Sequence, residues 1–305
     1  MKKVIAGLGI IILLLLVACG PGGGQPAVVG SPTAATPQKG LVFTPPATRE
    51  PGEAASIKVK PTDTPLPPPP TPTPLPVEEQ PTGGPMVQIP AGPFVMGSDD
   101  GDPNESPAQE VDLPAFEIDQ FEVTNADFAK FVEATGHVTD AEKQGIGNWR
   151  DYAAGKDNHP VVRVTYNDAV AFCQWVGKRL PTEAEWEKAA RGDDGRLYPW
   201  GNEWDPNKAN VKETGLRGTT AVGSFGEGVS PYGAHDMAGN VWEWTSSPFV
   251  AYPGSTYQDP FYSPDFRVIR GGAWFEEEPT VHVTSRNAGD PNITANDDVG
   301  FRCAK

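Results

Sequence analysis

Apolar and polar positions change their pattern twice along the chain and divide it into three parts. An apolar run broken only by glycines covers residues 4–17, directly after Met1-Lys2-Lys3. The stretch that follows, to residue 84, is dominated by proline, threonine and glycine. From there onward apolar positions recur at strand and helix spacings, which predicts one packed domain over residues 85–305.

The domain is predicted to begin with strands and to end in loops. Residues 86–90 and 94–97 flank a Pro/Gly turn and predict two strands, and residues 116–123 continue the strand pattern. After Gly192, glycine, asparagine and tryptophan recur without a helical period, so short strands joined by long ordered loops are expected. No internal repeat of roughly 20 to 50 residues is visible, which argues against a propeller or solenoid.

Three helices are predicted between these regions from their capping signals. Each begins after a threonine that is followed three residues later by an acidic residue, and apolar residues at helical spacing come next. The three threonines are Thr124, Thr165 and Thr182. Gly136 is expected to end the first helix.

The N-terminal run is typical of a secretion signal, because a short basic start precedes an apolar stretch too brief for a comfortable membrane span. Leu16-Val17-Ala18-Cys19 also resembles the bacterial lipobox, in which cleavage before the cysteine leaves a lipid-modified N-terminus. We therefore expect a signal peptide over residues 1–18 and a lipid-anchored chain that faces the extracytoplasmic side of the membrane and begins at Cys19. The alternative is an uncleaved anchor with a chance cysteine.

Residues 19–84 are expected to form a disordered tether. Eighteen of the 34 prolines lie between Gly20 and Pro85, so this stretch cannot supply regular helices or interior strands. Its composition cannot bury enough apolar surface to offset chain entropy, and its proline runs favour stiff polyproline II. We interpret it as a spacer, and a proline-rich ligand for a partner module is the alternative.

The charge balance excludes one class of partner. The formal net charge is −16, and residues 1–84 contain five acidic and six basic residues, which leaves −17 for the domain. An acidic domain without a basic stripe is not expected to bind nucleic acid. With 3 cysteines, the chain is not a disulfide-dense miniprotein either.

Eight motifs of the domain follow the order found in a known family. They are Gly97-Ser98-Asp99, Phe121-Glu122-Val123-Thr124-Asn125, Asn158-His159-Pro160-Val161, Lys178-Arg179-Leu180-Pro181-Thr182-Glu183-Ala184-Glu185-Trp186-Glu187, Tyr198-Pro199-Trp200-Gly201, Gly239-Asn240-Val241-Trp242-Glu243-Trp244, Arg270-Gly271-Gly272-Ala273-Trp274 and Gly300-Phe301-Arg302-Cys303. Over residues 85–305 the chain resembles the formylglycine-generating enzyme, or sulfatase-modifying factor, family. The resemblance implies a compact α+β domain related to the C-type lectin fold, low in regular secondary structure and usually holding calcium.

The oxidases of that family hold copper(I) with two cysteines five residues apart and use O₂ to convert a sulfatase cysteine to formylglycine. The matching positions here are Glu276 and Val281, and a nearby family serine is Ala273. Copper(I) prefers soft thiolate ligands, which neither replacement provides. Copper is therefore not expected.

A second catalytic branch of similar proteins, the ergothioneine-type sulfoxide synthases, binds iron through histidines of an added helical domain. The four histidines of this chain show no helical pairing, so an iron site is not predicted; they are His137, His159, His235 and His282. The run Glu276-Glu277-Glu278 leaves two interpretations open. The first is a solvated acidic loop, because like charges so close together are more stable in contact with water. The second is an acid/base pair or a hard-metal site.

Calcium is the expected metal. A carboxylate between Trp242 and Trp244 is costly to bury unless something positive compensates it, and Ca²⁺ takes carboxylate and carbonyl oxygens. The resemblance maps one family calcium site onto Asp236, Gly239, Val241 and Glu243, and a second onto Asn210, Val211, Glu213 and Leu216. A hydrogen-bonded turn without metal is the alternative for the first set.

The resemblance also places a disulfide between Cys173 and Cys303, which an oxidising compartment would keep bonded. With Cys19 lipidated, no thiol would then remain for redox catalysis.

These features predict a membrane-tethered extracytoplasmic domain that is a calcium-stabilised binding or accessory module and not an oxidase. Its ligand would be a peptide, protein or glycan in a cleft bordered by Trp242, Trp274 and Arg286. The alternative is an enzyme: a formylglycine-type oxidase with an unusual centre, or another oxidation that uses Glu276 and His282 with a hard metal.

Overall fold

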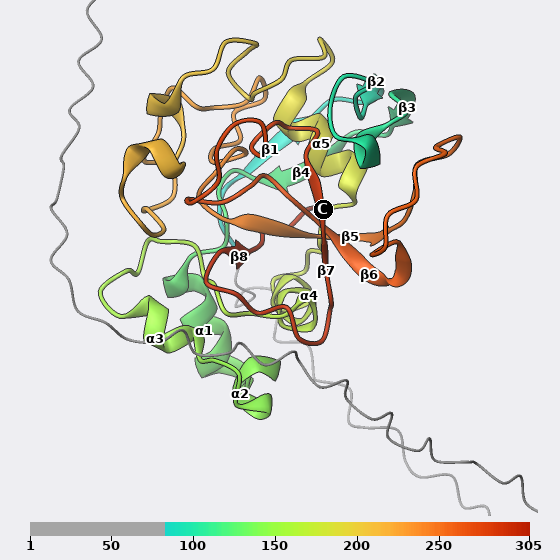
Figure 1. Ribbon diagram of the computed structural model, residues 1–305. Helices are drawn as coiled ribbons and strands as arrows, with labels where there is room; N and C mark the ends of the chain where they lie inside the picture. Colours follow the sequence, from blue (N-terminus) through green and yellow to red (C-terminus); the bar gives the residue numbers. More distant parts are fainter. Residues whose placement is uncertain (1–82) are drawn as a thin grey trace, which may run out of the picture. The chain divides into compact units, whose positions relative to one another are not determined.

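The computed structural model describes residues 83–305, which Figure 1 shows in colour. The predicted signal peptide, the lipidated Cys19 and all but the last residues of the tether lie outside the described residues. No helix within the described part of the chain is long and apolar enough to cross a membrane.

The strands of residues 83–305 form two antiparallel pairs and one larger sheet. β1 (Met86–Ile89) pairs with β4 (Phe116–Asp119), and β2 (Gly92–Met96) pairs with β3 (Gln109–Leu113). The larger sheet has the order β7-β6-β5-β8. Its members are β5 (Trp242–Phe249), β6 (Ser263–Arg270), β7 (Arg286–Gly289) and β8 (Val299–Gly300), and only the β5–β8 pair of this sheet is parallel.

The three predicted helices are confirmed, together with their caps. The side chains of Thr124, Thr165 and Thr182 each accept the backbone N–H three residues further on, and Gly136 ends the first helix at φ 70°. Two helices of 5 residues each were too short to show a period in the sequence. In chain order the α-helices are α1 (Asn125–Thr135), α2 (Asp140–Gln144), α3 (Trp149–Ala153), α4 (Tyr166–Trp175) and α5 (Glu183–Arg191).

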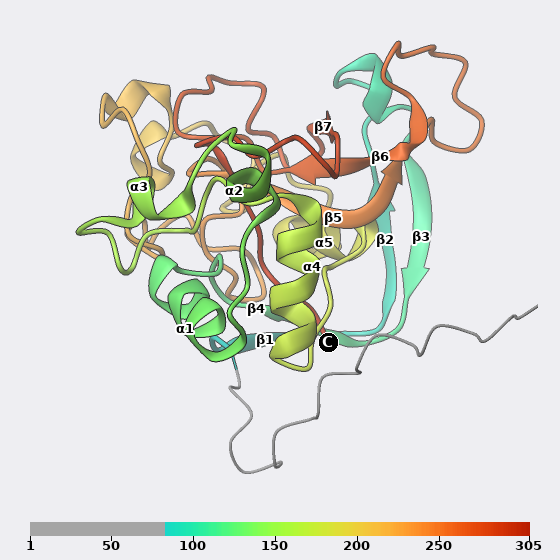
Figure 2. The same cartoon turned by 90° about the horizontal axis from the view of Figure 1, so that it is seen from below.

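The helices divide between two sides of the domain. α1, α2 and α3 group beside α4, away from the β2–β3 pair, in both Figure 1 and Figure 2. Aromatic side chains of α1 and α4 share one buried cluster with Trp244 of β5, and Phe128 and Phe172 are its helical centre. α5 instead contacts β2, β5 and β6. Between Gly192 and β5 the described chain forms loops and the two 3₁₀ turns Pro206–Lys208 and Lys212–Thr214, as the sequence predicts.

A disulfide ties the helical side to the C-terminal segment. Cys173 of α4 is bonded to Cys303 with a Cα–Cα distance of 5.7 Å, and both residues are fully buried. The predicted pairing is confirmed. Because the bond closes a loop of 130 residues, the chain-entropy model assigns it roughly 4–5 kcal/mol of stability.

Candidate functional site

The loop after β6 carries the residues that stand at the copper positions of the family. Gly271 and Gly272 begin it with φ values of 99° and 74°, which L side chains rarely adopt. A Cβ on Gly272 would lie 2.7 Å from a methyl carbon of Val281, so the loop folds back tightly on its own start. Val281 is consequently fully buried, whereas Glu276 remains partly exposed.

Glu276 lies against Trp242, which is itself buried in the core at 3% exposure. Burial raises the pKa of the Glu276 carboxyl, and a hydrogen bond from the Trp242 side chain and the charge of Lys212 oppose that rise. The Trp242 backbone N–H donates to the Asp298 carbonyl at 2.7 Å, which holds the segment before β8 next to the same tryptophan. Trp274 is partly exposed, and its backbone N–H donates to the Asn240 carbonyl at 3.0 Å.

Asp298 is a functional candidate that the sequence analysis missed. Burial, and then the charges of Asp297 and Glu276, raise the pKa of its carboxyl to about 6. Two carboxylates, those of Glu276 and Asp298, therefore lie within electrostatic reach of each other beside Trp242. No local motif marks Asp298, because its proximity to Glu276 arises only when β8 joins β5.

A second group of polar side chains lies on the other half of the same loop. The Tyr198 hydroxyl donates to Glu278 Oε1 at 2.5 Å and lies 3.0 Å from His282 Nε2. Burial is the largest cause that lowers the pKa of the His282 imidazole, and it also raises the pKa of the Tyr198 phenol. The sequence analysis selected His282 as a cleft candidate with Glu276 as its partner, whereas the structure gives it Tyr198 and Glu278.

Arg286 does not border the cleft, which corrects the prediction for this residue. It is buried in β7, where its Nε lies 2.8 Å from a Glu183 oxygen and its Nη1 donates to the carbonyls of Asn104 and Val250. Its guanidinium also covers the ring of Tyr252 at 4.1 Å. These contacts use the guanidinium to join separate segments and not to receive a ligand.

A charged centre, made by Glu243 and Arg302, lies beneath the larger sheet. Arg302 Nη2 and Nε donate to the two oxygens of Glu243 at 2.6 and 2.7 Å, and both side chains are fully buried. Trp186 Nε1 donates to the same carboxylate at 2.8 Å. The positive group that the sequence analysis required for Glu243 is therefore present in the chain itself.

Two further carboxylates adjoin this charged centre and bear on whether calcium fits there. Glu122 Oε2 is buried and has no hydrogen-bond partner among the described residues. Burial, and then the charge of Asp236, lift the pKa of Glu122 well above its usual range, and Glu243 adds to that rise. Three carboxyl groups thus lie near one guanidinium, and either protonation of Glu122 or a nearby cation would balance the remaining charge.

The donor set needed for calcium would include main-chain oxygens. In the described residues, no group of three or more His, Cys, Asp or Glu side chains is placed to hold a metal ion. The resemblance implies that the carbonyls of Gly239 and Val241 supplement Asp236 and Glu243, and such mixed oxygen ligation suits Ca²⁺, although both oxygens of Glu243 already accept hydrogen bonds from Arg302. Calcium at this segment remains a prediction.

The second predicted calcium set has fewer oxygen atoms that are free to bind a metal. The Val211 carbonyl already accepts the hydroxyl and the N–H of Thr214 at 2.7 and 3.1 Å, and the Asn210 amide donates to the Gly218 carbonyl. Glu213 and Leu216 instead line a neighbouring cavity of about 280 Å³. The contacts do not favour these four residues as one ligand set.

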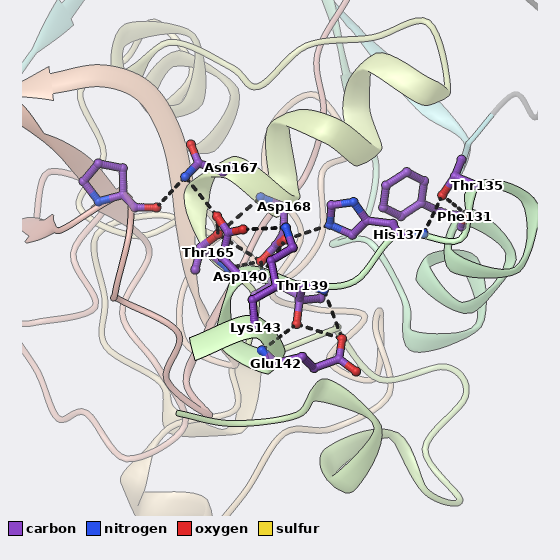
Figure 3. A network of polar contacts seen from close by, with 12 residues as sticks. Phe131, Thr135, His137, Thr139, Asp140, Glu142, Lys143, Thr165, Asn167 and Asp168 are labelled. Atoms are coloured by element: carbon purple, nitrogen blue, oxygen red, sulfur yellow. Dashed lines mark hydrogen bonds and ion pairs between the residues drawn. The ribbon is translucent and has the colours of Figure 1, made fainter. Parts of the chain in front are cut away.

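The four histidines have different partners. Figure 3 shows His137 directed at Asp168, with His137 Nε2 and a carboxylate oxygen 2.7 Å apart. The other oxygen of Asp168 accepts the N–H and the hydroxyl of Thr165 at 2.9 Å, so this network joins the end of α1 to the start of α4. His159 contacts Thr219, His235 packs on Phe121, and His282 contacts Tyr198.

Comparison with known proteins supports the resemblance. The model of the sulfatase-modifying factor enzyme 1-like domain matches residues 72–305. The chain is 37% identical to the inactive C-alpha-formylglycine-generating enzyme 2 of Bos taurus, over 72% of this chain and 87% of that protein. It is 36% identical to the formylglycine-generating enzyme of Mus musculus, over 72% and 74%.

Among solved structures, PvdO from Pseudomonas aeruginosa is similar with a TM-score of 0.59 and 30% identity, covering 72% of this chain and 93% of that one. The α+β fold of formylglycine-generating enzymes, low in regular secondary structure, is thereby confirmed.

The residues of this chain do not fit the copper of the family's oxidases. One copper position is a carboxylate, Glu276, and the other is Val281, a buried aliphatic side chain without a donor atom. Cys173 and Cys303 are bonded to each other and have no thiolate to offer.

Proposed function

The chain belongs to the sulfatase-modifying factor family, and we propose that it is a member of this family without formylglycine-generating oxidase activity. We propose that it works as a calcium-stabilised binding or accessory module, held outside the cytoplasm by lipidated Cys19. Its ligand would be a peptide, protein or glycan. The observation that carries the proposal is the disulfide between Cys173 and Cys303, which together with Glu276 and Val281 leaves the domain without a thiolate.

The relatives divide in a way that is compatible with this proposal. Similar sequences include a protein whose name describes it as inactive and proteins named as formylglycine-generating enzymes, at nearly equal identity. Overall sequence identity therefore does not separate the two groups. Oxidase activity has to be judged from the chemistry of the metal ligands. Oxidation at a copper(I) centre needs soft sulfur donors, and the loop from Ala273 to His282 contains none.

The binding surface in this proposal is the loop beside Trp242. Trp274 and Glu276, both partly exposed, combine aromatic surface with a carboxylate that has no guanidinium partner, while Trp242 is buried and holds Glu276 in place. Binding sites are commonly lined by apolar and aromatic groups with a few polar groups that fix orientation. Arg286 is left out of this surface, because its guanidinium is already engaged with Glu183.

The rival enzyme has less support. A hard-metal oxidation at Glu276 and His282 would need these two side chains to share one ion. Glu276 is instead held by Trp242, and His282 by Tyr198. Glu276 and Asp298 are the better acid/base candidates, because both carboxyl groups have raised pKa values and the charge of Glu276 acts on Asp298.

The oxidase question has a direct test. The purified full chain is loaded with copper and incubated under O₂ with a peptide that carries the sulfatase cysteine motif. Mass spectrometry then follows conversion of the thiol to the aldehyde. We expect no conversion by the wild type. Robust conversion would refute the proposal.

The Glu276→Cys/Val281→Cys variant is the matched comparison, because it restores both donors in an otherwise unchanged loop. Conversion by this variant alone would show that only the metal ligands are missing. A Glu277→Cys/Val281→Cys variant shifts one donor by a single position and serves as its control.

A further inference from the structure

Three aromatic rings gather beside the second half of the Glu276–His282 loop. Tyr198 stacks on Trp200 with ring centroids 5.2 Å apart and an interplanar angle of 7°. Trp204 lies 5.2 Å from Tyr198 and 6.2 Å from Trp200. Tyr198 is buried at 1% exposure, whereas both tryptophans remain partly exposed. The rings therefore form a fixed platform whose outer members reach the solvent.

The polar groups at this platform have a defined hydrogen-bond direction. The Tyr198 hydroxyl has one proton, which it donates to Glu278 Oε1. The contact between Tyr198 Oη and His282 Nε2 therefore requires the imidazole to donate from Nε2. The neutral His282 ring then carries its lone pair on Nδ1.

Two acceptors remain on either side of the Tyr198 hydroxyl. Both described polar contacts of the Glu278 carboxylate use Oε1, so Oε2 is open, and this side chain is 44% exposed. The His282 side chain is 16% exposed, and no side chain or backbone group of the described residues is hydrogen-bonded to its Nδ1. The protein thus presents two oriented acceptors near the partly exposed indole rings of Trp200 and Trp204.

We propose that Tyr198, Glu278 and His282, with Trp200 and Trp204, form a saccharide-binding site. Two neighbouring hydroxyl groups of a pyranose would donate to Glu278 Oε2 and His282 Nδ1, and the apolar face of the sugar ring would lie on an indole. Sugars combine closely spaced donors with an apolar face, which matches paired acceptors beside aromatic rings. Tyr198 is a positioning residue, because its hydroxyl orients both acceptors and keeps no proton for the ligand.

This inference rests on the proposed binding function and names its ligand class. The experiment titrates the purified full chain with the methyl pyranosides of glucose, galactose, mannose and N-acetylglucosamine. Saturation-transfer NMR and tryptophan fluorescence report binding. Nα-acetyl-lysine methylamide is titrated in parallel, because a cation is the other partner that the Glu278 charge could attract.

Three variants define the site. Glu278→Gln replaces one carboxylate oxygen with a donor and should weaken pyranoside binding at least tenfold. Tyr198→Phe keeps the ring but frees both acceptors, and should weaken binding with the indole contacts retained. Glu277→Gln is the control, because Glu277 pairs with Lys212 on the exposed side of the loop, and it should bind like the wild type. Melting midpoints show whether each variant is folded.

Saturable binding of a pyranoside that falls in both Glu278→Gln and Tyr198→Phe, and not in Glu277→Gln, supports the site. The inference is overturned if no pyranoside binds the wild type, if affinity is equal in all variants, or if only the lysine amide binds. Should Glu278→Gln not fold, Tyr198→Phe decides by the same criteria. Failure here leaves the absence of oxidase activity standing, because the peptide assay alone judges it.

Discussion

Glu243 and Glu276 each accept a hydrogen bond from a tryptophan side chain, Glu243 from Trp186 and Glu276 from Trp242. Their surroundings differ in every other respect. Glu243 is fully buried and receives two hydrogen bonds from Arg302, whereas Glu276 is partly exposed and has no guanidinium partner. Buried charges must be paired, so Glu243 belongs to the structure of the domain. Glu276 keeps acceptor capacity at the surface, where a ligand can use it.

The same division holds for the neighbours of these two residues. Under the sheet, Arg270 is paired with Glu187, and Arg286 with Glu183. In the loop that begins at Ala273, Glu278 is bound to a neutral tyrosine. Guanidinium groups compensate Glu183, Glu187 and Glu243 in the interior. In the loop, Glu276 and Glu278 accept hydrogen bonds from aromatic side chains, and Glu277 pairs with Lys212 at the surface.

The largest expected effect follows from breaking the interior pair. Arg302→Met leaves Glu243 buried without a cation, and removal of one partner of such a pair costs about 3–5 kcal/mol. The free energy of unfolding from urea titration measures the loss. Glu243→Gln/Arg302→Met should recover part of it, because the double variant no longer buries the unpaired charge. A loss below about 1 kcal/mol in Arg302→Met would contradict the structural role of the pair.

The loop supplies the matched control for this prediction. Lys212 and Glu277 form an ion pair at 2.5 Å, yet their side chains are 59% and 58% exposed. Exposed pairs contribute little, because solvent screens them and both side chains lose freedom. Lys212→Met should leave the urea midpoint unchanged. An equal loss in Lys212→Met and Arg302→Met would remove the distinction between the interior and the loop.

The comparison also shows which parts of the molecule the sequence could reveal. The caps at Thr124, Thr165 and Thr182 are local, so three residues suffice to recognise each of them. The motif around Trp242 and the glycines before Ala273 located the loop through the family resemblance. Pairings such as Glu243 with Arg302 join residues 59 apart in the chain, and no local pattern encodes them.

For the same reason Arg286 was assigned to the cleft and Asp298 was overlooked. Arg286 is only a short distance along the chain from the loop, but β7 directs it toward Glu183. Asp298 reaches Glu276 because β8 pairs in parallel with β5. Tyr198 lies in a family motif, yet only the folded chain shows that it contacts Glu278 and His282.

The next largest effect concerns a metal ion that would compensate the interior carboxylates in addition to Arg302. If calcium binds near Asp236, chelation should lower the melting midpoint. A ligand present at 100 times its dissociation constant stabilises the folded state by about 2.7 kcal/mol. Asp236→Asn should abolish the chelator effect with little structural damage, because an amide oxygen can still accept the Gly223 N–H.

Glu276→Gln serves as the control for the loop, and it should keep the full response to chelator. A response that disappears in Glu276→Gln and survives in Asp236→Asn would move the cation from the interior to the loop. An unchanged wild-type midpoint after chelation, with no calcium in the purified chain, would withdraw the site.

The smallest effect concerns Asp298, the partner of Glu276. Its pKa is about 6 in the folded chain, above the usual value near 3.9 in an unfolded one. Between about pH 4 and pH 6 the folded state therefore binds more protons, so this group makes unfolding easier as pH rises. Below that window it has no effect, and above it the destabilisation is constant.

Asp298→Asn should remove this dependence. The difference in unfolding free energy between the variant and the wild type should therefore shift in favour of the variant as the pH rises from 4.5 to 7.5. Because the carboxyl keeps some contact with water, the expected gain is about 1 kcal/mol and not the full value of a two-unit shift. Urea midpoints at the two pH values measure it. Asp297→Asn is the control, since Asp297 is 45% exposed, and most of the dependence should persist there. If Asp298→Asn behaves like the wild type at both pH values, the Asp298 carboxylate is compensated as fully as those of the interior, and Asp298 is no acid/base candidate.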